Sequence, residues 1–179
     1  MSRSQVRRPQ VTVIGDSDAP PELCTVAEQI GEMLARLGIT VVTGGRGGVM
    51  EAACRGAARS GSLTVGILPS SEMGDANNWC SVVIPTGLGH ARNAVNVLAG
   101  DFVIALGSSA GTLSEVCFAW ISGKPILTVK GFDGWLAKTG PELDHRGTSS
   151  TIECSDVDEL EKAVVSICES LPPATRTLN

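Results

Sequence analysis

The apolar positions of the chain form short, nearly uninterrupted runs, separated by longer segments in which apolar residues recur every three or four positions. The runs lack the polar alternation of a half-exposed strand, and they are typical of strands buried on both faces of a parallel sheet. We therefore expect strands at residues 11–14, 39–43, 63–68, 102–106 and 125–129, with shorter extended pieces at 82–84 and 151–154.

The intervening segments carry the helical spacing of apolar residues. Helices are expected at residues 20–37, directly after residue 48, and at 90–99, 110–122 and 156–170. Ser155 is the expected cap of the last helix. Strands that alternate with helices in this way predict an α/β fold, a single doubly wound, mostly parallel sheet with helices on both faces, Rossmann-like. Residues 1–9 are expected to be a flexible tail and residues 131–150 a long loop.

Composition narrows the class of protein. The 179 residues are 42% hydrophobic and 18% charged, which fits one globular domain. The net charge of −5 argues against general nucleic-acid binding, and no apolar run approaches the ~20 residues of a membrane span. The six scattered cysteines indicate buried free thiols in a reducing compartment, with a disulfide framework or a zinc site as the less favoured alternative. We expect a cytoplasmic protein without a resident metal.

Two loops after predicted strands are rich in small residues, "TGGRGGVMEA" and "LGSSAGTLSE". Ligands of doubly wound folds bind beyond the carboxyl ends of the strands, and a glycine turn before a helix offers backbone N–H groups to an anion. Neither loop is a Walker loop or a clean dinucleotide fingerprint, so tight turns without a ligand remain the alternative. The candidate anion-binding residues are Gly15, Asp16, Ser17, Gly44, Gly45, Arg46, Gly47, Gly48, Val49, Met50, Gly107, Ser108, Ser109, Ala110, Gly111 and Thr112.

Three further side chains are candidates for the same crevice. Arg92 and Asn93 fall in the first turn of a predicted helix, where a cation opposes the helix dipole, so Arg92 is either a solvated surface residue or an anion ligand. Glu115 completes a capping box that begins at Thr112, and it is also placed to face a ligand beside the glycine turn. His90 is isolated in the sequence, which gives it a weaker claim to a ligand contact.

Several of these stretches together resemble one superfamily. The segments "GGRGGVMEAACRGA", "TVGILP", "VIPTGLGHARNAV", "DFVIALGSSAGTLSEV" and "GKPIL" are similar to the Rossmann-like proteins often labelled lysine-decarboxylase-like, over about residues 11–129. Within that superfamily, the stretch "IPTGLGHARN" resembles the molybdenum cofactor carrier branch more than the LONELY GUY cytokinin-activating phosphoribohydrolases. The carrier resemblance implies molybdenum cofactor as bound cargo, a homodimer or homotetramer, and molybdenum enzymes as recipients.

The hydrolase resemblance implies a different use of the same crevice. Those enzymes carry a "PGGxGTxxE" motif and an upstream arginine, which Glu115 and Arg92 match and which act there at the N-glycosidic bond of a nucleoside 5′-monophosphate. Here Ser108 and Ser109 replace two glycines, so side chains stand where the backbone approaches a phosphate. No catalytic residue is therefore expected, with Arg92 and Glu115 as the catalytic pair of the alternative. Phosphate, molybdate or AMP-like anions are further ligand candidates, and a nucleotide or small-anion sensor is a third hypothesis.

Overall fold

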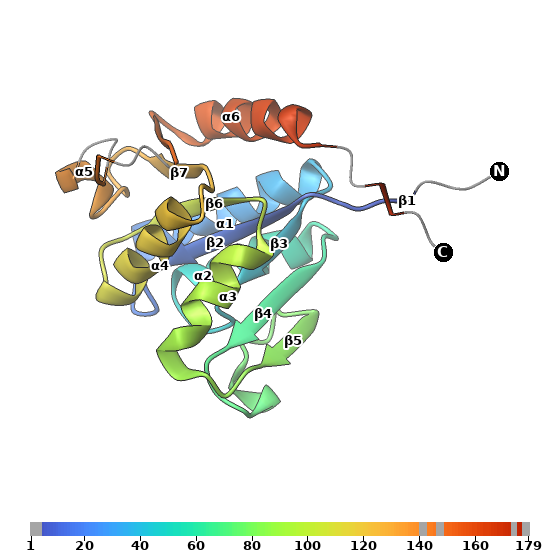
Figure 1. Ribbon diagram of the computed structural model, residues 1–179. Helices are drawn as coiled ribbons and strands as arrows, with labels where there is room; N and C mark the ends of the chain where they lie inside the picture. Colours follow the sequence, from blue (N-terminus) through green and yellow to red (C-terminus); the bar gives the residue numbers. More distant parts are fainter. Residues whose placement is uncertain (1–4, 140–142, 146–148, 173–174, 177–179) are drawn as a thin grey trace.

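Seven parallel strands form one sheet at the centre of the molecule (Figure 1). The computed structural model describes residues 5–139, 143–145, 149–172 and 175–176. The strands lie in the order β5-β4-β3-β2-β6-β7-β8, which confirms the predicted doubly wound sheet. Their bounds are β2 (Gln10–Gly15), β3 (Thr40–Thr43), β4 (Thr64–Leu68), β5 (Val82–Pro85), β6 (Phe102–Leu106), β7 (Ile126–Val129) and β8 (Thr151–Cys154).

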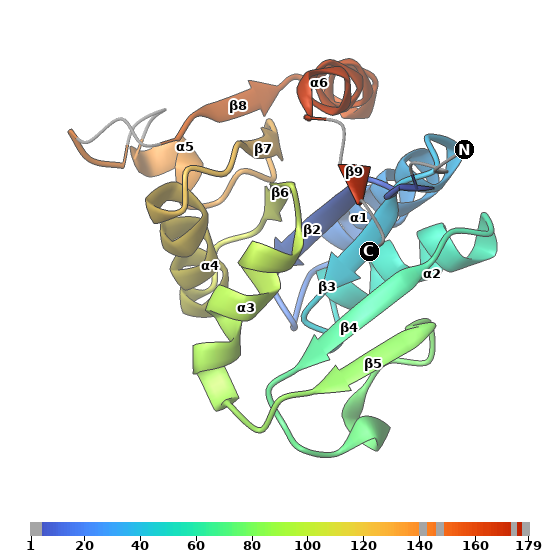
Figure 2. The same cartoon turned by 45° about the vertical axis from the view of Figure 1, so that its right-hand side comes forward.

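Helices cover both faces of this sheet (Figures 1 and 2). On one face lie α1 (Pro21–Arg36), α2 (Val49–Arg59) and α6 (Val157–Ser170), and on the other lie α3 (Arg92–Ala99) and α4 (Ala110–Ile121). Short elements complete the chain: 3₁₀ turns at Met73–Asp75 and Gly89–Ala91, helix α5 (Leu136–Thr139), and an antiparallel pair of β1 (Gln5–Val6) with β9 (Thr175–Arg176).

Strand β6 shows why the apolar runs have no polar alternation. Phe102, Ile104 and Leu106 belong to the apolar cluster under α1, α2 and α6. Val103 and Ala105 point to the opposite face and pack in the cluster under α3 and α4. Because both faces of the strand are covered, every side chain is at most 3% exposed, and each must be apolar to avoid burying an unpaired polar group.

Helices α1 and α2 pack with their backbones in close approach. A Cβ atom at Gly31 would lie 2.1 Å from the carbonyl oxygen of Ala53, and one at Gly56 would lie 2.1 Å from that of Glu28. Glycine is therefore required on both helices, although it lowers helix propensity by about 1 kcal/mol relative to alanine. An ion pair between Arg55 Nη2 and Glu28 Oε2, 2.7 Å apart, lies at the same junction.

Three local expectations need adjustment. The cap of α6 is Asp156, whose carboxylate accepts the Glu159 N–H at 2.8 Å, and not Ser155, because the carboxylate reaches that donor. The loop expected at 131–150 contains α5, a helix too short to give a periodic signal; residues 140–142 and 146–148 lie outside the described residues. Within the expected tail, residues 5–6 form β1, because β9 of the same chain offers a strand to pair with. Arg7 forms an ion pair with Asp101. Residues 1–4 lie outside the described residues.

Candidate functional site

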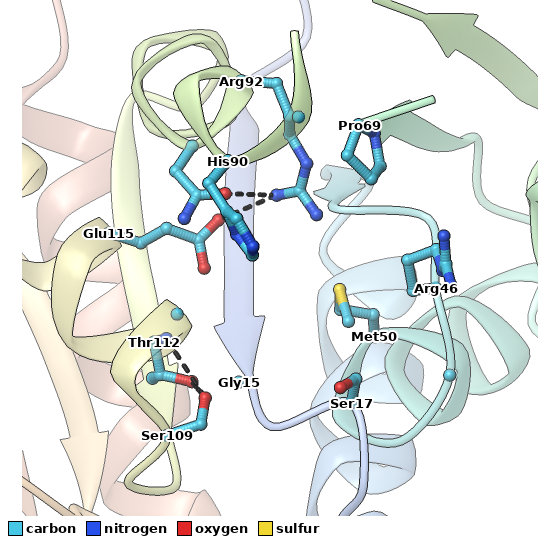
Figure 3. A pocket seen from close by; sticks show the side chains of 14 residues that line it. Gly15, Ser17, Arg46, Met50, Pro69, His90, Arg92, Ser109, Thr112 and Glu115 are labelled. Carbon is cyan, nitrogen blue, oxygen red and sulfur yellow. Dashed lines mark hydrogen bonds and ion pairs between the residues drawn. The ribbon is translucent and has the colours of Figure 1, made fainter. Parts of the chain in front are cut away.

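The candidate site lies where the order of the strands reverses. Strands β2 and β6 are neighbours in register, with Gly15 opposite Leu106, but the helices that follow them pass to opposite faces of the sheet. Their loops diverge and leave a cavity of about 570 Å³, as doubly wound folds do at such a switch point (Figure 3). It is lined by Gly15, Ser17, Arg46, Gly47, Met50, Pro69, Gly89, His90, Arg92, Asn93, Ser109, Gly111, Thr112 and Glu115.

The turn before α4 is occupied by a side chain of the protein itself. The Asp16 carboxylate accepts the N–H groups of Ser108 at 2.9 Å and Ser109 at 2.8 Å, and the Thr112 hydroxyl at 2.8 Å. Burial by itself would raise the pKa of Asp16, but these donors outweigh it and hold the pKa below its ordinary value. The N–H groups of Ser108 and Ser109, which were expected to bind an anionic ligand, therefore already have the Asp16 carboxylate as their anionic partner.

Gly107 makes this arrangement possible. Its φ of +92° lies in the region that side chains disfavour. A Cβ atom there would also lie 2.6 Å from the carboxyl carbon of Asp16. Gly107, directly after β6, thus leaves room for the carboxylate of Asp16, which follows the neighbouring strand β2.

Helix α4 begins differently from the expected capping box. Ser109 is the cap: its hydroxyl accepts the Thr112 N–H at 3.2 Å. Glu115 does not reach back to a cap N–H; it points toward α3, where Asn96 Nδ2 donates to its Oε1 at 2.7 Å. The capping-box interpretation of Thr112 and Glu115 is therefore wrong, because partners on another helix hold the carboxylate.

Arg92 is the second partner of that carboxylate. Its Nη1 donates to Glu115 Oε1 at 3.2 Å and to Asn93 Oδ1 at 3.0 Å, and its Nη2 lies 3.4 Å from the Gly44 carbonyl. Arg92 is 7% exposed, so the surface-arginine interpretation is wrong. Its Nε has no hydrogen-bond partner among the described residues, nor does Asn96 Oδ1. Because Arg92 also lines the cavity, this buried cation is suited to an anionic ligand.

Burial governs the electrostatics of this pair. It lowers the pKa of Arg92 and raises the pKa of Glu115, and in both groups it outweighs the mutual attraction of the two charges. The nearby charge of Arg46 also lowers the pKa of Arg92. The lowered pKa of Arg92 and the raised pKa of Glu115 both mean that the site destabilises the charged forms of these two groups. A bound anion would stabilise the guanidinium of Arg92.

The loop before α2 forms the opposite wall (Figure 3). Arg46, Gly47 and Met50 line the cavity there, and the Val49 N–H donates to the Asp16 carbonyl at 3.0 Å. Asn77 holds the loop from outside: its N–H donates to the Gly45 carbonyl at 2.8 Å, and its Nδ2 donates to the Arg46 carbonyl at 3.0 Å. This loop thus presents a cation and small residues to the cavity from a fixed backbone.

The structure brings together most of the residues proposed from the sequence. Asp16, Gly44, Gly45, Gly48, Val49, Gly107, Ser108 and Ala110 are not in the lining; they support the loops that form it. Pro69, Gly89 and His90 are in the lining without belonging to the candidate set. All three stand in segments that carry the superfamily resemblance, "TVGILP" and "VIPTGLGHARNAV", and they follow β4 and β5, whose carboxyl ends face the same crevice. Trp135 and His145, in the segment expected to be a long loop, do not line the cavity.

The cysteines and the apolar helices add two observations. All six cysteines are free; Cys54 and Cys154 are buried, whereas Cys117 on the outer side of α4 is exposed, so the expectation of buried thiols holds only in part. In the described part of the chain, no helix is long and apolar enough to cross a membrane.

A family model decides the membership of the chain. The model described as the SLOG cluster4 family matches residues 8–163. The chain belongs to the SLOG cluster4 family. An uncharacterized protein of Archaeoglobus fulgidus is 38% identical over 121 residues, which are 68% of this chain and 80% of the relative.

Solved structures place this family member beside proteins of named function. The molybdenum cofactor binding protein of Rippkaea orientalis is 36% identical, with a TM-score of 0.82 over 92% of this chain and 99% of that one. The molybdenum cofactor carrier protein of Chlamydomonas reinhardtii is 31% identical, with a TM-score of 0.81 over 91% and 99%. DNA processing protein A of Helicobacter pylori, at 18% identity and a TM-score of 0.66 over 89% and 81%, shares the fold alone.

Proposed function

We propose that this protein binds molybdenum cofactor as cargo in the cavity between the α2 and α4 loops and delivers it to molybdenum enzymes. The named functions of the Rippkaea orientalis and Chlamydomonas reinhardtii proteins support the cargo, and their similarity to this chain extends over nine-tenths of its length. The observation that carries the proposal in this chain is the buried Arg92, which lines a cavity of about 570 Å³ and whose Nε has no hydrogen-bond partner among the described residues.

The charges of the lining favour a polyanion. Arg46 and Arg92 line the cavity, and Glu115 is the single carboxylate among the lining residues. The protein as a whole carries a formal charge of −5, so the cationic lining is a local feature. Molybdenum cofactor, a pterin with a terminal phosphate and a dithiolene-bound metal oxo group, presents negative charge at both ends. Two guanidinium groups on opposite walls suit such a ligand.

Asp16 sets the direction in which the cargo binds. Its carboxylate occupies two N–H groups at the start of α4 and would repel a phosphate placed there. The start of α2 carries Arg46 and the lining residues Gly47 and Met50 instead. We therefore place the phosphate end of the ligand against the α2 loop, where the helix N-terminus and a cation act together.

Cofactor retention tests this function. Purified protein loaded with molybdenum cofactor under anaerobic conditions should retain it through gel filtration and slow its oxidative loss in air. Arg46→Ala should weaken retention about tenfold or more, whereas the matched control Arg36→Ala, on the exposed surface of α1, should not. Absence of retention and of protection by the unmodified protein refutes the proposal. Nucleotides that displace the cofactor at equal concentration would favour the small-anion sensor instead.

A nucleoside 5′-monophosphate phosphoribohydrolase is the second candidate function. The observation that favours it is the Arg92–Glu115 pair on the cavity wall. Burial raises the pKa of Glu115, and a raised carboxyl pKa suits a group that transfers protons. Release of a free base from a panel of nucleotides, abolished in Glu115→Gln, would establish this activity. A complete panel without base release excludes it.

The outer faces of α3 and α4 suggest self-association. Val95, Leu98, Phe118 and Ile121 are exposed there, with Leu98 at 59% and Ile121 at 57%. We propose that a second copy of the chain covers this apolar face in a homodimer or homotetramer. Leu98→Glu should shift the mass measured by light scattering to that of the monomer, whereas Leu63→Glu, at an exposed leucine before β4, should not. A monomeric unmodified protein refutes the assembly.

A further inference from the structure

Two cysteines lie in contact behind the glycine loop of the cavity. Cys54 is on α2 and Cys80 lies two residues before β5. Their Sγ atoms are 4.0 Å apart although 26 positions separate them in the chain. Cys54 is fully buried, while Cys80 is half-buried. Cys80 is thus the residue of the pair with some solvent exposure, and Cys54 has none.

The surrounding residues leave space for this contact. A Cβ atom at Gly66, in the middle of β4, would lie 2.7 Å from Cys80 Sγ. Glycine within a strand is destabilising, and here it makes room for the sulfur. The Thr43 hydroxyl lies 3.3 Å from Cys54 Sγ and fixes the second thiol. The chain therefore holds the two sulfurs about 2 Å beyond the length of a disulfide bond.

We propose that Cys54 and Cys80 form a reversible disulfide when a peroxide oxidises the protein. The Cys80 thiolate attacks one peroxide oxygen, so that an S–O bond forms, the O–O bond breaks and the leaving hydroxide takes a proton. The Cys54 sulfur then attacks the Cys80 sulfenic acid; the S–S bond forms, the S–O bond breaks, and the second water carries away the Cys54 proton. Two thiols lose two electrons and one peroxide becomes two waters.

The electrostatics assign these two roles. The hydrogen bond between the two thiols lowers the pKa of Cys80, so Cys80 is the sulfur that ionises and attacks. The same hydrogen bond, followed by burial, raises the pKa of Cys54, which keeps its proton until the sulfenic acid forms. The partly exposed residue is thus the nucleophile and the buried residue resolves the intermediate.

The disulfide would act on the loop that lines the cavity. Asn77, three residues before Cys80, donates to the carbonyls of both Gly45 and Arg46. A disulfide bond from Cys80 to Cys54 ties the segment 77–80 to α2, the helix that follows the loop of Gly45 and Arg46. We expect the Asn77 N–H to exchange with solvent several-fold more slowly in the oxidised protein, because local opening of the segment then requires movement of α2 as well.

Peptide mapping of the full chain tests the disulfide directly. The reduced, dilute protein is treated with one equivalent of hydrogen peroxide, its remaining thiols are alkylated, and it is digested with trypsin without reductant. Peptide 47–55, with Cys54, and peptide 60–92, with Cys80, should appear as one cross-linked species that is two hydrogens lighter than their sum. In Cys54→Ser, a dione reagent should trap sulfenic acid at Cys80. In the control Cys117→Ser, which removes the exposed cysteine, the cross-link should persist.

Two results would refute the proposal, one for the disulfide and one for its effect on the loop. Peroxide that oxidises Cys117 or Cys24 without producing the 47–55/60–92 species refutes the disulfide, and this result needs no variant to fold. Unchanged exchange of the Asn77 N–H in cross-linked protein refutes the effect on the loop. Neither measurement involves a ligand, so their failure leaves the proposed cargo untouched, and failure of the cargo leaves them valid.

Discussion

Replacement of Asp16 tests the central feature of the site. Asp16→Ala removes the acceptor of three donors at the start of α4, the N–H groups of Ser108 and Ser109 and the hydroxyl of Thr112. It also removes a negative charge from the N-terminus of a twelve-residue helix. Asp16→Asn is the matched variant, since it keeps one carbonyl oxygen as an acceptor and loses only the charge.

The expected loss follows from the number and kind of these bonds. A hydrogen bond to a charged group contributes about 1.5–3 kcal/mol when it is buried, and a helix cap contributes about 1 kcal/mol. The two N–H bonds lie near solvent, which reduces the value of each. We expect Asp16→Ala to lower the free energy of unfolding by about 3 kcal/mol and Asp16→Asn by about 1 kcal/mol. At this chain length, 3 kcal/mol corresponds to roughly 6–12 °C in Tm.

Acid should reduce the difference in unfolding free energy between Asp16→Ala and the unmodified protein. The folded-state pKa of Asp16 lies below its ordinary value, so its contribution is present above the unfolded pKa of about 3.9 and is lost as the pH falls through the folded pKa. Urea unfolding of Asp16→Ala and unmodified protein at pH 7, 5 and 3.5 measures this. Phosphate should also stabilise Asp16→Ala more than the unmodified protein, because the start of α4 becomes free to bind it.

Two results would overturn the reasoning. A loss below about 0.5 kcal/mol at pH 7 would mean that water replaces the carboxylate without cost. A loss that stays constant from pH 7 to pH 3.5 would mean that packing, and not the charge of Asp16, stabilises the turn. Equal stabilisation of both proteins by phosphate would contradict the argument that the Asp16 carboxylate keeps phosphate away from the start of α4.

Three further variants follow from the same structure. Gly107→Ala should lower the free energy of unfolding by about 1–3 kcal/mol, because of the positive φ and the contact of the new Cβ with the Asp16 carboxylate. In an Asp16→Ala background the loss measured by chemical unfolding should be smaller, and equal losses in both backgrounds would exclude the contact. Arg92→Ala leaves Glu115 buried without its cation and should lower the free energy of unfolding by about 3–5 kcal/mol. The loss should be smaller at pH 4 than at pH 8, because a buried carboxyl group with a raised pKa destabilises the folded protein as the pH rises and the group ionises. Asp156→Ala should lower Tm more than Ser155→Ala, and the reverse order would return the cap to the serine.

The order of strands and helices was predictable because each strand is buried on both faces. The predicted strands at 102–106 and 151–154 coincide with β6 and β8, and the helix predicted at 156–170 begins one residue before α6. Apolar runs of this kind leave a parallel sheet as the simplest arrangement, and the rule that its ligands bind at the carboxyl ends of strands then pointed to the loops that line the cavity.

Partners far apart in the sequence were not predictable. Glu115 fits a capping box locally, and only the packing of α3 against α4 shows that Asn96 and Arg92 hold its carboxylate. Asp16 looked like one more ligand residue, because its contact with Ser108 spans 92 positions and requires the register of β2 with β6. His90 stands in the quoted segment "VIPTGLGHARNAV", but nothing local to an isolated histidine shows that it lines the cavity. In each case tertiary contacts decided which of several plausible local roles a side chain fills.

The glycine contact between α1 and α2 has a mechanical consequence for the cavity. Backbone meets backbone at Gly31 and Gly56, so no rotamer change can let these helices slide, and the α2 side of the cavity is a stiff wall. On the opposite side, α3 and α4 are joined to each other through the longer side chains Arg92, Asn96 and Glu115, whose torsions can adjust. Any widening of the mouth must therefore arise on the α3–α4 side, the side that also exposes the apolar face.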